Sequence, residues 1–578
     1  MKIIRTRNFL WLLAISCLVP IFYAKHEKLT HNIVLKSVSE CPINGTDPIR
    51  LSDVYSTQIA SRIYEGLYTY HYLKRPLEVI PNLAEGMPTI SPDGLVYTCK
   101  IKKGVFFQDN TCFPDGKGRE LKATDFVFSF KRVVDPSNVV PYADFIDGKI
   151  KGLDQWKKSP DYNQAVEGLK ALDDYTLQIT LTAPCPQFIY VLTMWITYVV
   201  PQEAVLHYGD KFKNHPVGTG PFSLPKGFNP QAKQLTFIKN PTFRDCFFPT
   251  ASAPEYKHML VYAGKKLPLV DQLITHVITE EQPRWLKIKK GEVDIIPLDE
   301  GSAVALAHIK EGNLLPEHLA NGLQLDQSTS ATTEFFCFNH NHELFGKNDY
   351  LRKAMSMAFD RATYRQMFYN DATDLAKSLL PPMMTTNNHN LIAPYDYNIA
   401  QAKAYLAKAG YPEGKGLPMI TLDTRIETAY KNKADFFAKC MDKIGIKVEV
   451  ITNVWPEFKN KIFVKQATMM HLITWAADYP EENNMLEGIS NKNLFGLQYE
   501  DAAFNRHLAK ACAEPDLNKR RTLYAQLNQM VAEKVPAIFA VHAPTQFIHR
   551  KEVKNFIYTV FNLSSDQYIA IEQVEKPQ

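Results

Sequence analysis

Residues 419–452 read MITLDTRIETAYKNKADFFAKCMDKIGIKVEVIT and alternate between short apolar runs and one longer amphipathic segment. The runs 419–423 and 446–452 have the length and the apolar content of strands. Between them, residues 428–443 are numerous enough for a helix and carry apolar side chains at helical spacing. A strand, a helix and a second strand in this order are the signature of an α/β lobe.

The same alternation extends outward from this stretch. On its N-terminal side the spacing predicts helices over 281–290, 349–369 and 398–409, and a strand over 293–296. Earlier in the chain, strands predominate. The elements predicted there are a strand at 33–39, a helix at 58–68, strands at 96–101, 104–108 and 177–181, and a helix at 126–134 with Thr124 or Asp125 as its N-cap.

Composition limits the class of protein. A chain of 578 residues is too long for one hydrophobic core, so we expect two or three domains. Hydrophobic residues make up 45% and charged residues 22%, which indicates a globular protein and neither a disordered nor a fibrous one. The formal net charge is +5, and no basic stripe is interleaved with aromatic residues. The sequence therefore does not support nucleic-acid binding.

The N-terminus has the composition of an export signal. Residues 1–7 are cationic and 9–24 form an apolar run, so we expect 1–24 to direct export. Cleavage near Ala24, lipidation of Cys17 and an uncleaved anchor are three open modes of processing. The nine cysteines include no Cys-x-x-Cys pair, so a structural zinc site has no ligand spacing to rest on. Cys99 and Cys112 flank a short loop and are the pair best placed for a disulfide.

Several blocks along the chain resemble one family when they are taken in order. They are Asp47-Pro48 with RIYEGL (62–67), DGLVYT (93–98), LKATDFV (121–127), GLKALDD (168–174), PVGTGPF (216–222), KNP (239–241), GEVDI (291–295), LRKA (351–354) with Asp360-Arg361, and AKAYLAKAGY (402–411). In this order the chain resembles the family-5 extracytoplasmic solute-binding proteins of bacterial ABC importers, which bind oligopeptides, dipeptides or nickel. The oligopeptide binders are the most similar, and the resemblance spans residues 45 to 560.

The resemblance implies a fold. Members of this family have the two-lobed fold of periplasmic binding proteins, in which two α/β lobes close on a buried ligand and an extra domain is inserted near the N-terminus. The expected boundaries are 25–60, 188–329 and 543–578 for lobe one, 61–187 for the extra domain, and 330–542 for lobe two.

The resemblance also implies a function, which is capture of peptides in the periplasm and delivery to an inner-membrane ABC permease with its ATPase subunits. Such a protein is expected to be a monomer with no catalytic residue, no cofactor and no resident metal. The alternatives are a metal chelate, haem or a cell-wall peptide as ligand, or an exported enzyme. His340 and His342 could face one side of a strand as metal ligands do. For an enzyme, the chain contains no Gly-x-Ser-x-Gly, His-Glu-x-x-His or P-loop motif.

The segment ITWAADYP (473–480) matches the ligand-anchoring run of the oligopeptide binders. By this resemblance Asp478 supplies a carboxylate to the α-amino group of a bound peptide. A buried ammonium group needs such a partner, because burial without one is costly. Trp475 and Trp455 match positions whose indole faces bracket a ligand side chain. Ala477, in the same run, is expected to touch the ligand.

Two more aromatic residues belong to the expected site, and one feature of the family is missing. Tyr142 matches an extra-domain tyrosine that reaches the pocket, and Phe335 begins an aromatic run that touches the ligand. The Arg and His with which oligopeptide binders meet peptide carboxylates have no counterpart here. His471, Lys461 and Arg425 are the candidates for that role.

Overall fold

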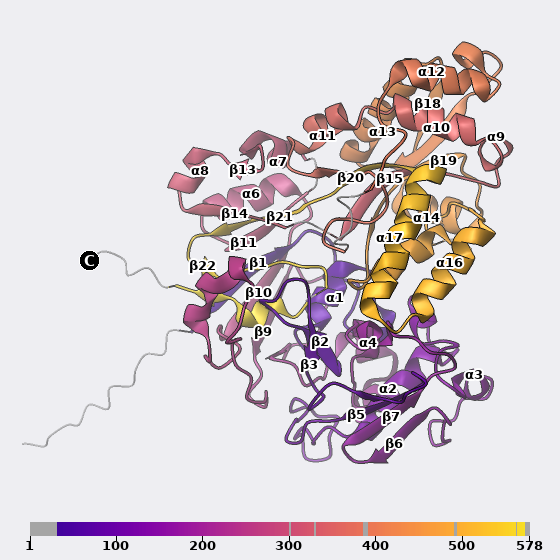
Figure 1. Ribbon diagram of the computed structural model, residues 1–578. Helices are drawn as coiled ribbons and strands as arrows, with labels where there is room; N and C mark the ends of the chain where they lie inside the picture. Colours follow the sequence, from indigo (N-terminus) through magenta and orange to yellow (C-terminus); the bar gives the residue numbers. More distant parts are fainter. Residues whose placement is uncertain are drawn as a thin grey trace, which may run out of the picture.

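The computed structural model describes residues 32–299, 302–328, 331–384, 391–490, 494–561 and 563–572 as a mixed α/β protein (Figure 1). The expected α/β class is therefore confirmed. The predicted export signal over 1–24, including Cys17, lies outside the described residues. Within them, no helix is long and apolar enough to cross a bilayer. The eight cysteines they contain are all free, so Cys99 and Cys112 form no disulfide.

The largest sheet has six strands, in the spatial order β16 (Asp374–Leu375), β20 (Ala537–His542), β15 (Thr332–Phe338), β19 (Met470–Ala476), β17 (Ile420–Arg425) and β18 (Val448–Asn453). Strands β17 and β18 are parallel, and α13 (Thr428–Asp442) connects them as the sequence predicts. Strand β15 lies at the centre and is antiparallel to both of its neighbours, β19 and β20. The ring of Phe336 on β15 stacks on Phe437 of α13 with centroids 4.3 Å apart, which fixes the helix on this sheet.

Two smaller sheets are built from the N-terminal part of the chain, and the second also contains a strand from the C-terminal tail. The first has the order β1 (Val34–Ser39), β10 (Gln272–Val277), β9 (Gln234–Lys239) and β8 (Phe222–Ser223), and β1 is parallel to β10. The second has the order β11 (Ile295–Leu298), β21 (Thr545–Arg550) and β14 (Leu323–Ser328). Because β21 lies between two strands from much earlier in the chain, the tail returns to this part of the fold.

A separate antiparallel sheet lies within residues 61–187. Its order is β4 (Thr89–Ile90), β5 (Val96–Lys100), β7 (Thr176–Thr180) and β6 (Leu169–Asp173), and α2 (Ala123–Val134) packs on it. The N-cap of α2 is Lys122, so the expected Thr124 or Asp125 cap is wrong. Asp125 instead sits in the first turn and accepts a hydrogen bond from the backbone N–H of Lys122 at 2.8 Å. At the other end of α2, buried Arg132 pairs with Asp47 at 2.8 Å and joins this sheet to the segment that precedes α1.

The remaining helices lie around these sheets, and the remaining strands pair in two-stranded sheets (Figure 1). They are α1 (Val54–Ala60), α3 (Leu153–Trp156), α4 (Phe188–Val191), α5 (Gln202–Tyr208), α6 (Glu281–Lys289), α7 (Ala303–His308), α8 (Pro316–Ala320), α9 (Glu343–Gly346), α10 (Asp349–Ala358), α11 (Arg361–Tyr369), α12 (Ile399–Lys408), α14 (Trp455–Lys459), α15 (Glu482–Leu486), α16 (Ala502–Ala513), α17 (Leu517–Lys534), β2 (Tyr68–Tyr70), β3 (Val79–Pro81), β12 (Ile309–Lys310), β13 (Asn313–Leu314), β22 (Val553–Lys554) and β23 (Ala570–Ile571).

Two predicted helices differ in the structure. The helix expected over 349–369 is two helices, α10 and α11, because the side chain of Asp360 caps a new start by accepting from the N–H of Thr363 at 3.1 Å. The helix expected over 58–68 ends at Ala60. Beyond it, the carbonyl of Ile63 accepts from the N–H of Gly220 at 2.8 Å. That tertiary bond replaces the helical one.

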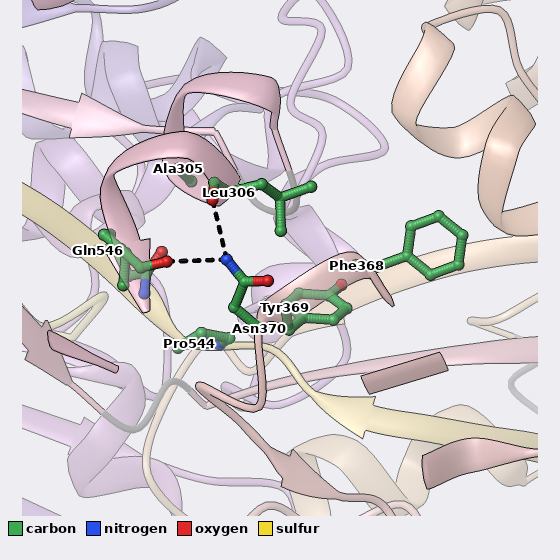
Figure 2. Close-up of a pocket in the computed structure, with 8 residues that line it drawn as sticks. Ala305, Leu306, Phe368, Tyr369, Asn370, Pro544 and Gln546 are labelled. Atoms are coloured by element: carbon green, nitrogen blue, oxygen red, sulfur yellow. Dashed lines mark hydrogen bonds between the residues drawn. The ribbon is translucent and has the colours of Figure 1, made fainter. Parts of the chain in front are cut away.

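The chain passes between the three-stranded sheet and the six-stranded sheet at two neighbouring places. Strand β14 continues toward β15, and β20 continues toward β21, while β14 pairs with β21 and β15 pairs with β20. Beside these crossings, Asn370 ends α11 in a left-handed conformation (φ 45°). Its side-chain amide donates to the carbonyls of Leu306 at 3.1 Å and Ile309 at 2.8 Å, around a cavity of about 10 Å³ (Figure 2). The amide thus ties α11 to the segment around α7.

Candidate functional site

The turn after β19 holds Asp478 in a defined position. Strand pairing ends where the N–H of Ala477 donates to the carbonyl of Ala331 at 3.0 Å. The next N–H, that of Asp478, donates to the side-chain oxygen of Asn484 at 2.8 Å. The amide nitrogen of Asn484 in turn donates to the Asp478 carboxylate at 3.3 Å. One buried asparagine on α15 therefore orients both the backbone and the side chain of Asp478.

The carboxylate of Asp478 lacks a positive partner in the described part of the chain. Burial raises its pKa to about 7, the hydrogen bond from Asn484 opposes this shift, and the nearby carboxylate of Asp144 adds to it. No lysine, arginine or histidine among the described residues forms an ion pair with it. A shielded acid beside a second acid is stabilised by a cation, and a ligand can supply one.

Tyr142 lies close to Asp478, and its contact with a ligand stays a prediction. Burial and then the negative charge of Asp478 raise the pKa of the Tyr142 hydroxyl. Its ring packs edge-on against Trp195 with centroids 5.2 Å apart. Next to Asp478, the ring of Tyr479 stacks on Tyr190 at 5.7 Å and contacts Phe145 at 6.2 Å. The anchor segment after β19 is thus in contact with elements from the N-terminal part of the chain.

A polar cluster near α17 forms a second contact between the same parts. The side-chain amide of Gln187 donates to Glu481 at 3.2 Å and to the hydroxyl of Tyr524 at 3.0 Å. Glu481 also pairs with Arg520 at 2.6 Å. Because all four residues are buried, these bonds favour a conformation in which the two parts meet around Asp478.

The two predicted tryptophans occupy different surroundings. Trp475 on β19 is half-buried, and its ring meets Phe495 at 5.2 Å. Trp455 begins α14 and is 45% exposed, with the guanidinium of Arg425 lying over its ring at 5.4 Å. Phe458 contacts both the Trp455 ring at 6.0 Å and the His471 ring at 6.5 Å. Bracketing of one ligand side chain by both indoles stays a prediction.

Phe335 and His471 are enclosed by the core. The Phe335 ring is fully buried against Phe495 at 5.2 Å and Phe539 at 5.6 Å. A ring nitrogen of buried His471 lies 2.9 Å from the carbonyl oxygen of Phe495, and burial lowers the pKa of His471 to about 4. A neutral imidazole cannot supply a positive charge to a carboxylate at neutral pH. The surroundings of both residues favour packing roles, and ligand contact by either stays a prediction.

Of the other candidate cations, Arg425 is the more available one. Lys461 already pairs with Asp423 at 3.2 Å. Arg425, at the end of β17, donates through Nε and one Nη to Glu427 at 3.1 and 2.6 Å, and its other Nη makes no hydrogen bond within the described residues. Its side chain is 33% exposed and lies over Tyr430 at 4.5 Å. It is also close enough to Tyr55, which lies in α1, for the two groups to interact electrostatically.

Sequence reasoning missed two residues of this site. Asn484 orients Asp478, and Asp144 adds negative charge beside it, but neither has a motif of its own. A search for amide side chains soon after the anchor run could have suggested Asn484. Asp144, more than three hundred positions away, offers no such signal.

The two histidines considered as metal ligands have separate partners. A ring nitrogen of His340 lies 3.0 Å from the carbonyl of Pro536, and His342 accepts a hydrogen bond from the N–H of Leu344 at 3.3 Å. Among the described residues, no group of three or more His, Cys, Asp or Glu side chains could hold a metal ion.

Comparison with known proteins shows the family. A sequence model described as "Bacterial extracellular solute-binding proteins, family 5 Middle" matches residues 78–495. The dipeptide-binding protein of Escherichia coli is 26% identical over 511 residues, which are 86% of this chain and 86% of that protein. Heme-binding protein A of Haemophilus influenzae is 24% identical and aligns over 94% of this chain and 93% of its own length. Members of this family are extracellular or periplasmic binding proteins and not enzymes.

Solved structures show the same fold. A periplasmic binding protein of Helicobacter pylori in complex with a peptide superposes with a TM-score of 0.71 at 24% identity, covering 94% of this chain and 99% of that one. The oligopeptide-binding protein of Bacillus subtilis in complex with a nonapeptide gives 0.71 at 19% identity, covering 93% and 99%. The expected two-lobed fold is therefore confirmed, and this chain belongs to the family 5 bacterial extracellular solute-binding proteins.

Proposed function

We propose that this protein captures short peptides with a free α-amino group and delivers them to an ABC permease driven by ATPase subunits. One observation carries the proposal, which is the shielded carboxylate of Asp478 without a cationic partner in the described part of the chain. The dipeptide- and di/tripeptide-binding relatives support it.

The chemistry of the anchor follows from burial. An ionised carboxylate shielded from water is unstable unless it is paired, and its pKa rises as a result. The α-ammonium group of a peptide restores the missing charge and offers three hydrogen-bond donors. Tyr142 and Asp144, which lie near Asp478, would make the surroundings more favourable to that cation.

For the other end of the peptide we propose Arg425. Its second Nη can meet a carboxylate while the first keeps its bond to Glu427. The rings of Tyr430 and Trp455 hold the guanidinium in place and form an apolar wall beside it. A receptor with one residue for each terminus binds short peptides better than long ones.

The proposal includes the organisation of the chain. The protein acts as a monomer in the periplasm, anchored through Cys17 lipidation or an uncleaved signal, or released after signal cleavage. Lobe one comprises 25–60, 188–329 and 543–578, the extra domain 61–187, and lobe two 330–542. The lobes rotate about the two crossings, where β14 pairs with β21 and β15 with β20.

The test is to identify what the protein carries. The full chain is purified under mild conditions, denatured and extracted, and the extract is analysed by mass spectrometry and by absorbance in the haem Soret region. Short peptides, present in the wild type and depleted in Asp478→Asn, are the expected result. Stoichiometric haem or a peptide-free metal chelate would overturn the proposal. A protein isolated empty is then titrated with di- and tripeptides by calorimetry, and absence of binding to all of them overturns it equally.

A further inference from the structure

A cavity of about 400 Å³ lies beside the two crossings, and neither Arg425 nor Trp455 is among its described lining residues. Its wall combines the N-terminal part of the chain, the strand β14, lobe two and the tail. The lining includes Arg75, Glu255, Tyr256, Asp326, Ala331 and Met383. This volume lies within the range of about 300–1,000 Å³ that is usual for small-molecule sites.

One carboxylate in this wall is without a partner. The half-buried side chain of Asp326 on β14 makes no hydrogen bond or ion pair within the described residues. Burial raises the pKa of Asp326 to about 6. Burial raises the pKa of the hydroxyls of Tyr72 and Tyr256, and the nearby charge of Asp326 adds to both shifts.

The other charged groups of the wall leave an excess of negative charge. Arg75 donates to the backbone carbonyls of Tyr72 at 3.2 Å and Lys74 at 2.7 Å, and its guanidinium lies over Tyr256 at 5.0 Å. Glu255 is exposed at the rim, where water screens its charge. With one cation and two carboxylates among its described lining residues, the cavity favours a positively charged occupant when Asp326 is ionised.

The cavity begins next to the proposed amine anchor. Ala331 lines it, and the carbonyl of the same residue accepts the hydrogen bond from the N–H of Ala477 at 3.0 Å. Ala477 immediately precedes Asp478. A peptide held by its amino group at Asp478 therefore has the cavity within reach of a long side chain on one of its first residues.

We infer that this cavity is a side-chain subsite for lysine or arginine, with Asp326 as the counter-charge. The inference rests on the proposed peptide function and adds a selectivity to it. Asp326 pairs with the ammonium or guanidinium group at the far end of the side chain, and the methylene groups pack along Met383 and the ring of Tyr256. The receptor is therefore selective for peptides with a basic residue near the amino terminus.

Calorimetry with synthetic tripeptides tests this inference. Lysine is placed at position one, two or three of an alanine tripeptide, and each peptide is compared with its norleucine counterpart, which has a similar shape but no charge. At one position lysine is expected to bind about 10- to 100-fold tighter than norleucine, the usual range for a hydrogen bond to a charged group.

Two variants locate the effect. Asp326→Asn keeps the side-chain shape and should abolish the preference for lysine while leaving the binding of trialanine unchanged. The Asp326→Asn variant is expected to fold, because the change removes a carboxylate whose charged form burial disfavours. Glu255→Gln removes a carboxylate from the rim of the same cavity and should change the preference less than about threefold, since exposed charges are worth little.

The outcomes separate the two proposals. If trialanine binds but lysine gives no advantage at any position, or if Asp326→Asn keeps the advantage, the subsite is refuted and the peptide function stands. If neither trialanine nor any lysine peptide binds, the peptide function itself is refuted, and the subsite with it.

Discussion

The two ends of the proposed peptide site are built in opposite ways. Asp478 is shielded, has a pKa of about 7 and meets no cation in the described residues. Arg425 is 33% exposed and already paired with Glu427 at 2.6 Å. At the first end, the carboxylate has no cationic partner among the described residues, so a ligand cation would complete a charge pair. At the second, the ligand shares a charge that is already balanced.

This difference predicts where affinity arises. A charge pair formed away from water is strong because little solvent screens it, whereas a pair at a half-exposed arginine competes with water and with Glu427. We therefore expect the amino terminus of a peptide to determine whether it binds. The carboxyl terminus should only adjust how tightly it binds.

The largest expected effect is that of Asp478→Asn. Removing one member of a shielded charge pair costs about 2–5 kcal/mol, or roughly 30- to 4,000-fold in affinity. N-acetylation of the peptide should weaken binding to the wild type similarly, and the two losses should not add, because either one breaks the same pair. Calorimetry on the four combinations measures this coupling. Equal affinity of acetylated and free peptides for the wild type would remove Asp478 from the site.

A smaller effect is expected for Arg425→Gln. Loss of a hydrogen bond from a charged group to the peptide carboxylate should weaken dipeptide binding about tenfold, the lower end of the range because the site is half-exposed. Lys459→Gln is the matched control, since its ammonium group also lies over the Trp455 ring, at 5.3 Å. Peptides with an amidated carboxyl terminus should not distinguish Arg425→Gln from the wild type. A tenfold loss for these amides as well would show that Arg425 acts on the fold and not on the carboxylate.

The pH dependence should also differ between the two ends. Because the pKa of Asp478 is about 7 in the unliganded protein, affinity should rise with pH from 5 to 7, by at most about tenfold per unit, and then level off. Asp478→Asn should flatten this slope, and Arg425→Gln should keep it. A wild-type affinity that is constant between pH 5 and 7 would mean that Asp478 does not titrate on binding.

The stability of the unliganded protein should change with pH in the opposite direction to the peptide affinity. An aspartate in the unfolded chain has a pKa of about 3.9, so on raising the pH the unfolded state releases its proton first. The contribution of Asp478 to stability therefore falls between about pH 4 and 7 and is constant above that range. Thermal melting at pH 7.5 should accordingly show Asp478→Asn at least as stable as the wild type. A clearly lower melting temperature would instead assign Asp478 a structural role.

The smallest effect is expected at Trp455, which is 45% exposed. Its contact with Arg425 is a cation–π pair at a surface, worth about 0.5–1 kcal/mol. Trp455→Ala should therefore weaken peptide binding only about two- to fivefold by calorimetry. Trp455→Phe, which retains an aromatic face, should keep most of the wild-type affinity. A loss as large as that of Asp478→Asn would place the main binding energy at the carboxyl end and reverse the comparison.

Much of the fold could be predicted because its signals are local. The strands at 419–423 and 446–452 and the helix between them were confirmed, since periodicity and β-branched content act within each segment. The helix expected over 58–68 was wrong because the spacing of its apolar residues indicates which side chains are buried and does not fix a helical backbone. Ile63 and Leu67 are buried as predicted, but the backbone around Ile63 bonds to Gly220 instead of continuing a helix.

By itself the sequence determined the α/β class, the family and the position of the anchor run that contains Asp478. Only the tertiary structure decided which cations are available. In the folded protein His471 is buried and neutral, and Lys461 pairs with Asp423. One Nη of Arg425 makes no hydrogen bond within the described residues. The tertiary structure also brought Asp144 and Asn484 to Asp478, and Asp326 to a cavity beside Ala331. Charge and burial depend on neighbours that are distant in the chain, and for that reason no local pattern predicts them.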